Sequence, residues 1–188
     1  DDGTPTELVA ADAQMWNPLM NLVDGAVSAP LKTSRYLGSY YIEVTFPIEG
    51  LKFRSNLGLD SRTVQDYQFY SSKTSKRQLG TSYAENGMSK YTMMTLENMF
   101  FYNKDFGKDH SLGLTLLQSI QEDKNESNQV GVQDIASDKL QYNDIASALT
   151  VDNIGSKLVK WNMASFMGRV NYSYKGKYLF TGSARYDG

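Results

Sequence analysis

The sequence contains no cysteine and a single histidine, His110. The absence of cysteine excludes disulfides, thiolate nucleophiles and cysteine-ligated metal sites. A lone histidine forms no cluster with metal-ligand spacing, so we expect no metal site, no cofactor and no catalytic residue. We interpret His110 as a turn residue in front of a strand.

The sequence also lacks an excess of charge of one sign and a long apolar run. Its 19 basic and 21 acidic residues give a net charge of −2, so no electrostatic attraction draws the chain to nucleic acid. No run approaches the roughly 18 apolar residues of a membrane-spanning helix. A transmembrane β-strand needs only about 10 alternating residues, so insertion as a β-barrel stays open. With 40% hydrophobic and 12% aromatic residues, the chain is not disordered.

Alternation of apolar and polar residues is the dominant pattern, and it is typical of β-strands with two different faces. In residues 36–48, Tyr40, Ile42 and Val44 share one face, and Glu43 lies on the other. The same pattern predicts strands at residues 36–48, 51–62, 91–103, 110–121, 158–174 and 177–187.

Short and long connections alternate between these predicted strands. Tight turns are expected at 49–50, 104–109 and 175–176, and long polar loops at 63–90 and 122–157. A β-sandwich has no reason to place every short turn at one end of its strands, whereas outer-membrane barrels have short periplasmic turns and long outer loops. We therefore predict that residues 36–188 form a partial barrel, with the two long segments and residues 1–35 as outer loops.

Two further features belong to this prediction. Leu140, Ile145 and Leu149 predict a short helix over 137–149, capped by Ser137. Aromatic residues gather near the expected tight turns, as in a membrane-interface girdle, although aromatics also favour strands in general. These aromatics are Phe46, Phe53, Tyr102, Tyr172, Tyr174, Tyr178 and Phe180.

The segment from Met163 to Gly188 contains Gly-Arg-Val-Asn-Tyr, Tyr-Lys-Gly-Lys-Tyr-Leu and Ala-Arg-Tyr-Asp-Gly. It resembles a barrel hairpin of the SusC/RagA-type TonB-dependent outer-membrane transporters. Shorter segments resemble other parts of that family in the family's order, at residues 17–19, 49–60, 96–98 and 102–110.

The resemblance implies an all-β fold in which about six antiparallel strands form part of a barrel of roughly 22 strands. Such a barrel needs on the order of 220 residues for its strands alone. We therefore expect an internal barrel fragment without the plug domain.

The resemblance also implies a function and partners for the parent protein. It predicts import of a nutrient through the outer membrane of a Bacteroidetes-like bacterium, with an oligosaccharide favoured and a peptide as the alternative. The implied partners are a SusD-like surface lipoprotein, a TonB complex acting through an N-terminal region that this chain lacks, and outer-membrane lipid. No nucleic acid and no enzymatic activity are expected. A second hypothesis is a soluble all-β binding or adhesion module, whose apolar rows form a sandwich core.

Aromatic residues in the predicted outer loops are the candidate substrate-binding residues, since an aromatic face can stack on a sugar ring or pack against a peptide side chain. They are Trp16, Phe69, Tyr70 and Tyr83. Loop packing explains them equally well. A set of basic residues alternates with polar neighbours on the strands, either as a charged translocation wall or as a salt-bridged barrel interior. This set comprises Lys52, Arg54, Arg169 and Arg185.

Overall fold

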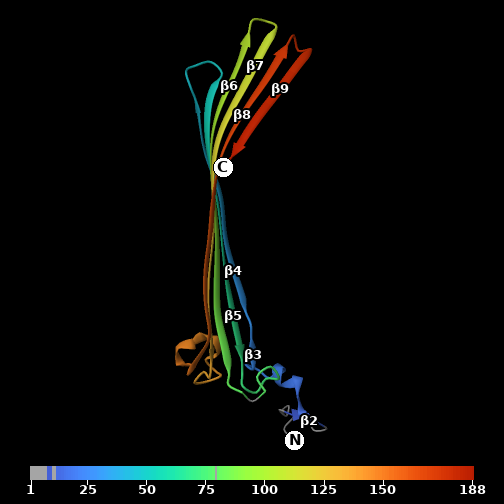
Figure 1. Ribbon diagram of the computed structural model, residues 1–188, viewed down its shortest axis with the longest axis vertical. Helices are drawn as coiled ribbons and strands as arrows, with labels where there is room; N and C mark the ends of the chain where they lie inside the picture. The colour runs from blue at the N-terminus through green and yellow to red at the C-terminus, as the bar shows by residue number, and fades with distance from the viewer. Residues whose placement is uncertain (1–7, 10–11, 79) are drawn as a thin grey trace. The chain divides into compact units, whose positions relative to one another are not determined.

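The fold is all-β, as the sequence predicts. The computed structural model describes residues 8–9, 12–78 and 80–188, with side chains from residue 17 onward. Its large antiparallel sheet has seven strands: β3 (Val27–Ser28), β4 (Leu31–Thr45), β5 (Leu51–Tyr70), β6 (Tyr83–Phe106), β7 (His110–Gln133), β8 (Thr150–Tyr174) and β9 (Tyr178–Asp187). Strands β5 to β9 pair in chain order, while β3 and β4 both pair with β5 (Figure 1). A separate two-stranded sheet contains β1 (Leu8–Val9) and β2 (Asp12–Trp16).

The chain divides into two compact units. Unit 1 comprises the residues up to 34 together with 63–90 and 126–158, and unit 2 comprises 35–62, 91–125 and 159–188. Strands β4 to β8 contribute residues to both units, whereas β3 belongs to unit 1 and β9 to unit 2.

Each of the six expected strands has a counterpart in β4 to β9, but most are longer than predicted. The predicted loops 63–90 and 122–157 shrink to 71–82 and 134–149. Residues 122–129 are polar at every position, so they show no alternation. They still form strand because a backbone ladder needs no apolar face when neighbouring strands supply its hydrogen-bond partners.

The short connections gather at one end of unit 2, as expected (Figure 1). They are residues 46–50, 107–109 and 175–177. Each contains a glycine with positive φ, a conformation that glycine adopts without steric cost. At Gly50 (φ +79°) glycine is required for a second reason, because a Cβ there would lie 1.7 Å from the backbone oxygen of Asn103.

Unit 1 contains an apolar core of its own. Phe69 of β5, Ala84 of β6, Val132 of β7 and Ile135 form a buried cluster, in which Phe69 and Ala84 have no exposed surface. Partly buried side chains of the loop 134–149 pack against this cluster. This loop is therefore held by core packing.

Two predictions within unit 1 are wrong. The expected helix over 137–149 is replaced by two 3₁₀ turns, η2 (Gln141–Asn143) and η3 (Ile145–Ser147), separated by Asp144 at φ −135° and ψ 70°. Asn, Asp and Ser favour turns over helix interiors, which explains the break. Residues 1–35 are not loop throughout in their described part, because it contains β1 to β3, the 3₁₀ helix η1 (Pro18–Leu22) and the start of β4.

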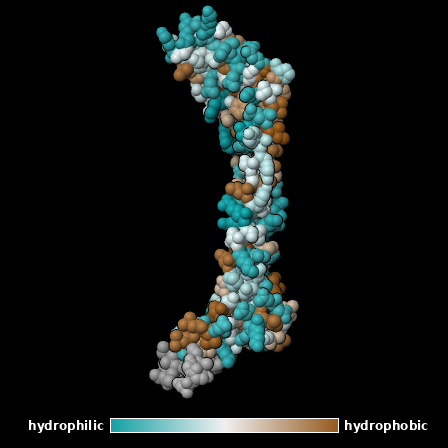
Figure 2. All heavy atoms as spheres, turned by 180° about the vertical axis from the view of Figure 1, so that it is seen from behind, coloured by the Kyte–Doolittle hydropathy of each residue, from teal (hydrophilic) through white to brown (hydrophobic). Residues whose placement is uncertain are grey.

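Unit 2 has no apolar core. Among the described residues of unit 2, the buried ones are Asp60 and Ser165, both polar. Large hydrophobic side chains are exposed instead, including Ile42, Leu116 and Phe180, and Figure 2 shows brown hydrophobic residues at the molecular surface. A sandwich requires a second layer over one face, so the alternative hypothesis of a soluble sandwich is wrong for unit 2. Within the described residues, no helix has the length and apolar character to cross a membrane.

The close approach at Gly50 predicts a difference between two turn substitutions. Gly107 also has positive φ (+68°), but nothing lies within 4 Å of the position of its Cβ. Gly107→Ala should therefore cost only the roughly 1–2 kcal/mol of a left-handed alanine. Gly50→Ala must also displace the backbone of Asn103, so it should lower the unfolding temperature of the full-length protein in detergent further. Equal unfolding temperatures for the two variants would show that the turn at Gly50 is not closely packed.

Candidate functional site

One side of the unit 2 sheet carries polar and charged side chains, and we call it the polar face. Successive residues of a strand point to opposite sides, so contacts between neighbouring strands establish which residues share this face. Its members in contact with one another are Arg35, Tyr41, Glu43, Lys52, Arg54, Asn56, Asp60, Tyr91, Met93, Glu97, Gln121, Asp123, Ser165, Asn171, Thr181, Arg185 and Asp187.

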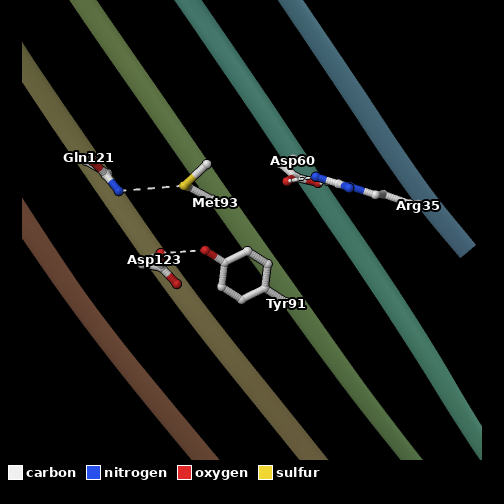
Figure 3. Close-up of polar contacts among 6 residues, drawn as sticks. All are labelled: Arg35, Asp60, Tyr91, Met93, Gln121 and Asp123. Carbon is white, nitrogen blue, oxygen red and sulfur yellow. Dashed lines mark hydrogen bonds and ion pairs between the residues drawn. The ribbon is translucent and has the colours of Figure 1, made fainter. Parts of the chain in front are cut away.

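A bidentate ion pair joins β4 to β5 on the polar face. The Arg35 Nε donates to Oδ1 of Asp60 over 2.9 Å, and Nη2 donates to Oδ2 over 2.6 Å (Figure 3). The Asp60 side chain is only 12% exposed. Because both carboxylate oxygens already accept from Arg35, we interpret this pair as a link between strands.

Further contacts link the next strands across the same face. Asn56 Nδ2 of β5 donates to Glu97 Oε2 of β6 over 3.3 Å. The Tyr91 hydroxyl of β6 donates to Asp123 Oδ2 of β7 over 2.7 Å, and beside it a Gln121 amide approaches a Met93 sulfur (Figure 3). Polar side chains thus connect four neighbouring strands into one wall.

The opposite side of the unit 2 sheet is apolar and aromatic, and we call it the apolar face. Phe53 and Phe100 lie on it with ring centres 4.8 Å apart, and the register of β8 and β9 places Phe166 opposite Tyr186. The outward rows expected from alternation, such as Tyr40, Ile42 and Val44, belong to this face because Glu43 and Tyr41 contact the polar one. The sheet therefore presents two chemically different surfaces.

His110 lies in an aromatic cluster at the turn end of the apolar face. Its Nδ1 is hydrogen-bonded to the Tyr172 hydroxyl over 2.6 Å, and its ring centre is 4.9 Å from that of Tyr174. Tyr174 in turn stacks on Tyr178. In the part of the chain that is described, no group of three or more histidine or acidic side chains is placed to hold a metal.

Comparison with curated proteins decides the family. No profile of a known protein family matches the sequence. TonB-dependent receptor P3 of Formosa agariphila is 32% identical over 160 residues, covering 84% of this chain and 16% of the receptor. TonB-dependent receptor P26 of the same organism is 32% identical over 165 residues, covering 82% and 16%. The chain belongs to the SusC/RagA-type TonB-dependent receptors. It spans about a sixth of the length of these relatives.

Solved structures agree on the fold of this receptor segment. The structure of the RagAB peptide transporter matches with a TM-score of 0.73 at 16% identity, covering 92% of this chain and 19% of that one. The RagAB peptide importer in the 'open-open' state matches with a TM-score of 0.75, covering 99% and 20%. The large sheet is therefore a section of a barrel, which confirms the predicted fold class.

The basic residues of the receptor's polar face are mostly paired. Lys52 Nζ lies 3.8 Å from a Glu43 carboxylate oxygen. The Arg54 guanidinium lies over the Tyr41 ring, 4.4 Å from its centre, and Nε donates to Asn56 Oδ1. This arrangement favours the salt-bridged interior among the two alternatives.

At the other edge of the sheet the pattern is similar. Arg185 Nε donates to Asp187 Oδ1 over 2.7 Å, and Nη2 donates to Ser165 Oγ over 3.2 Å. Arg169 is exposed, and no salt bridge to it occurs among the described residues. Arg169 is therefore the residue of this set that still fits the predicted charged translocation wall.

The polar face carries two exposed aromatic residues that are not among the predicted substrate-binding candidates. Tyr41 of β4 is 64% exposed, and Trp161, four residues before Ser165 on β8, is 44% exposed. Both were absent from the candidates because those were sought in loops. Their place in the polar rows of the alternation is the signal that identifies them.

The predicted loop aromatics turn out to lie in strands. Phe69 is fully buried in the core of unit 1, so it does not fit the prediction of a substrate contact. Tyr70 and Tyr83 lie on β5 and β6 with ring centres 6.3 Å apart, and Lys76 Nζ lies 3.8 Å from the Tyr70 ring centre. Trp16 ends β2, and its side chain lies outside the described residues.

Tyr83 is held by polar neighbours as well as by its aromatic contact. Its hydroxyl donates to Glu85 Oε2 over 2.5 Å. Burial, and then this hydrogen bond, raise the pKa of Tyr83 to about 12. The phenol therefore stays protonated, and a donor, throughout the physiological pH range.

A depression of about 320 Å³ lies in unit 1 between η1 and the two long loops. Asp24, Lys73, Asp138 and Lys139 line it, and Ser71 Oγ donates to Asp138 Oδ2 over 2.6 Å. Its mixed charges and hydroxyl suit a ligand with many hydrogen-bonding groups. It is the second candidate binding surface, beside the polar face.

The burial of Phe69 predicts a structural role for that residue. Phe69→Ala should destabilise unit 1 by about 3–5 kcal/mol, since it leaves a cavity in the core. Limited proteolysis of the full-length receptor should then cut the loops 71–82 and 134–149 faster. Leu149→Ala, at an 80% exposed side chain, is the matched control and should leave the cleavage rate unchanged. Unchanged cleavage in Phe69→Ala would contradict the packing role.

Proposed function

We propose that the protein containing this chain imports an oligosaccharide through the bacterial outer membrane. The observation that carries this proposal is the division of the unit 2 sheet into an apolar and a polar face without an apolar core. Such a sheet is stable where hydrocarbon meets one side and water meets the other. The family relationship supports the same role for the whole receptor.

The height of the apolar face suits a bilayer. On β7 it runs from Leu112 to Ile120, and the next outward residues are Glu122 and Lys124. Nine residues at about 3.3 Å each, tilted by roughly 40°, span about 23 Å, close to the apolar band of roughly 25 Å in outer-membrane barrels. The cluster around His110 and Tyr172 then forms part of an aromatic girdle on the side of the short turns.

The polar face carries the kinds of side chain that bind oligosaccharides. Exposed aromatic rings at Tyr41 and Trp161 can stack on the apolar sides of sugar rings. The surrounding amides and carboxylates can exchange hydrogen bonds with sugar hydroxyls. Peptide import is the alternative, and RagAB, a structural neighbour, is described as a peptide transporter.

The implied partners follow from the family and belong to this proposal. A SusD-like lipoprotein covers the barrel mouth, and a TonB complex supplies energy. The loops 71–82 and 134–149 of unit 1 then face outward, where the lipoprotein and the incoming substrate arrive. Transport requires no covalent chemistry, so the proposal includes no enzymatic activity.

Adjacent cysteines test the placement in the membrane. Val170 and Asn171 are neighbours on β8 that point to the apolar and the polar face, and the chain has no native cysteine. Asn171→Cys should react with a charged, water-soluble maleimide, whereas Val170→Cys should resist it in intact outer membranes. Labelling of the unsubstituted receptor gives the background. Equal reaction at both positions would show that water reaches both faces, and the outer-membrane placement would fail.

Substitutions on β4 test the substrate class. Tyr41→Ala should lower the uptake of labelled oligosaccharides about two- to tenfold, because one aromatic contact is worth roughly 0.5–1.5 kcal/mol. Tyr36→Ala, on the apolar face of the same strand, is the control. Unchanged oligosaccharide uptake, together with reduced uptake of a labelled peptide pool, would decide for the peptide alternative.

A further inference from the structure

Two tyrosines of unit 1 carry the chain's own basic side chains on their rings. Tyr70 of β5 and Tyr83 of β6 have ring centres 6.3 Å apart, and we call them the tyrosine pair. Lys76 Nζ lies 3.8 Å from the centre of the Tyr70 ring, and the Arg77 guanidinium lies 5.6 Å from the centre of the Tyr83 ring. The pair therefore presents ring faces that attract cations.

The loop 71–82, which supplies both cations, is fixed at its start by hydrogen bonds to other segments. Ser71 Oγ donates to Asp138 Oδ2 over 2.6 Å, which joins this loop to the loop 134–149. The Ser75 backbone amide donates to Asn21 Oδ1 over 3.0 Å, which joins it to η1. The first half of the loop is thus held independently of the tyrosine pair.

Lys76 and Arg77, which follow this fixed part, lack an acidic partner. Neither forms an ion pair with a carboxylate among the described residues. Besides its ring contact, Arg77 donates from Nε to the Thr81 carbonyl over 2.8 Å and from Nη2 to Gln133 Oε1 over 2.9 Å. An exposed cation–π contact contributes only about 0.5–1 kcal/mol. A cation of a ligand can therefore replace one of these side chains on its ring.

Glu85 supplies a carboxylate beside the pair that no basic residue neutralises. Its Oε2 accepts from the Tyr83 hydroxyl over 2.5 Å. Within the described part of the chain, no Lys or Arg forms an ion pair with Glu85. The side chain is half-buried, and a partly desolvated carboxylate gains more from a cationic partner than an exposed one does. Glu85 therefore offers an anchor for a cation next to the Tyr83 ring.

The other charges on this side of the unit 1 strands also favour a cation. Asp152 accepts from Gln133 Nε2, and Asp66 of β5 adjoins Gly87 of β6. The basic residue that these strands place on the same side is Lys157, four residues beyond Asn153 on β8 and thus about 13 Å away along the strand. If Arg77 leaves the Tyr83 ring, the nearby charges of the strands are all negative.

Glycines make the sheet beside Glu85 flat enough for a sugar ring. A Cβ at Gly87 would lie 3.9 Å from the Cβ of Gln129 on β7, and a Cβ at Gly155 of β8 would lie 3.3 Å from the Cγ of the same residue. Both positions lack a side chain, so a ligand can approach the backbone there. The amides of Gln129 and Asn153 can exchange hydrogen bonds with sugar hydroxyls. This strip favours a sugar that carries an amino group over a flexible lysine side chain.

We propose that Glu85 and the Tyr83 ring bind a protonated amino group of an oligosaccharide, and that this group displaces Arg77 from the ring. Arg77 is the side chain displaced because Tyr83 is the ring bonded to Glu85. The displaced guanidinium releases the second half of the loop 71–82 from the sheet. This inference rests on the proposed function and narrows its substrate class to oligosaccharides that contain amino sugars.

The test compares two sugars that share ring and linkage. Glucosamine tetramer and cellotetraose are both β-1,4-linked and differ at carbon 2, where one carries an ammonium group and the other a hydroxyl. Isothermal titration calorimetry measures their binding to the full-length receptor in detergent, at about pH 6, where the amines are protonated and Glu85 is ionised. We expect the glucosamine tetramer to bind about fivefold more tightly at low ionic strength, and added salt to reduce this preference.

Glu85→Gln should remove most of this preference, because the Tyr83 hydroxyl can still donate to the amide oxygen while the negative charge is lost. Glu97→Gln is the matched control, since it makes the same change on the same strand at a carboxylate bonded to Asn56. Arg77→Ala should strengthen the binding of glucosamine tetramer about two- to threefold, because it removes the competing cation. A purely structural role of Arg77 would give the opposite result.

Four results would overturn the inference. They are equal binding of the two sugars by the unsubstituted receptor, an unchanged preference in Glu85→Gln, weaker binding of glucosamine tetramer in Arg77→Ala, and tighter binding of tetralysine than of glucosamine tetramer through Glu85. The last result would assign the site to a basic peptide.

Uptake measurements separate this failure from that of the proposed function. A receptor that imports cellotetraose through the outer membrane but shows no preference for the amino sugar refutes the amine site alone. A receptor that binds glucosamine tetramer through Glu85 but imports no oligosaccharide refutes the proposed import and leaves the binding site in place.

Discussion

The alternation of side chains across a single-layer sheet is the constraint on which unit 2 depends. Each strand sends one set of residues to either side, and no second layer covers either set. Backbone groups within the sheet are paired by the ladders, so the two faces are free to meet different solvents. Apolar residues on one face and charged residues on the other then specify hydrocarbon and water. In unit 2, β4 and β9 are the edge strands, and each presents one row of backbone groups that has no neighbouring strand among the described residues.

The polar face is organised by contacts that are individually weak. Exposed salt bridges such as Lys52 with Glu43 contribute about 0–1 kcal/mol each. Their role is better explained by the surface that they create. Paired charges keep this face polar without giving it a large net charge. Among the described residues of this face, Tyr41 and Trp161 are the exposed aromatic rings, and the Arg54 guanidinium lies over the Tyr41 ring.

Alternation made part of this structure predictable from the sequence. Residues 36–48 show which side faces which solvent, because Ile42 and Glu43 differ in polarity. Residues 122–129 could not be assigned in this way, since both sides of that strand segment are polar and the pattern vanishes. The alternation of short and long connections indicated a barrel, and the family resemblance supplied its size, which no periodicity in a short segment specifies.

The candidate site was less predictable, because exposure depends on neighbours far away in the sequence. The sequence predicts Phe69 as a loop aromatic, whereas in the structure it is buried in a core with Ala84 and Val132. Trp161 shows the opposite case, because it lies in a predicted strand and its side chain is nevertheless exposed. Sequence position alone does not distinguish these two aromatics.

The two units differ in what stabilises them. Unit 1 is stabilised by its own buried cluster around Phe69. Unit 2 has no such cluster, so its free energy depends on the medium that contacts its apolar face. In that setting, the polar side chains of Ser55, Asn98 and Gln118 on the apolar face are a poor match to hydrocarbon. Their mutual hydrogen bonds join β5, β6 and β7 and offset part of this cost, so they stabilise the sheet where it has no core.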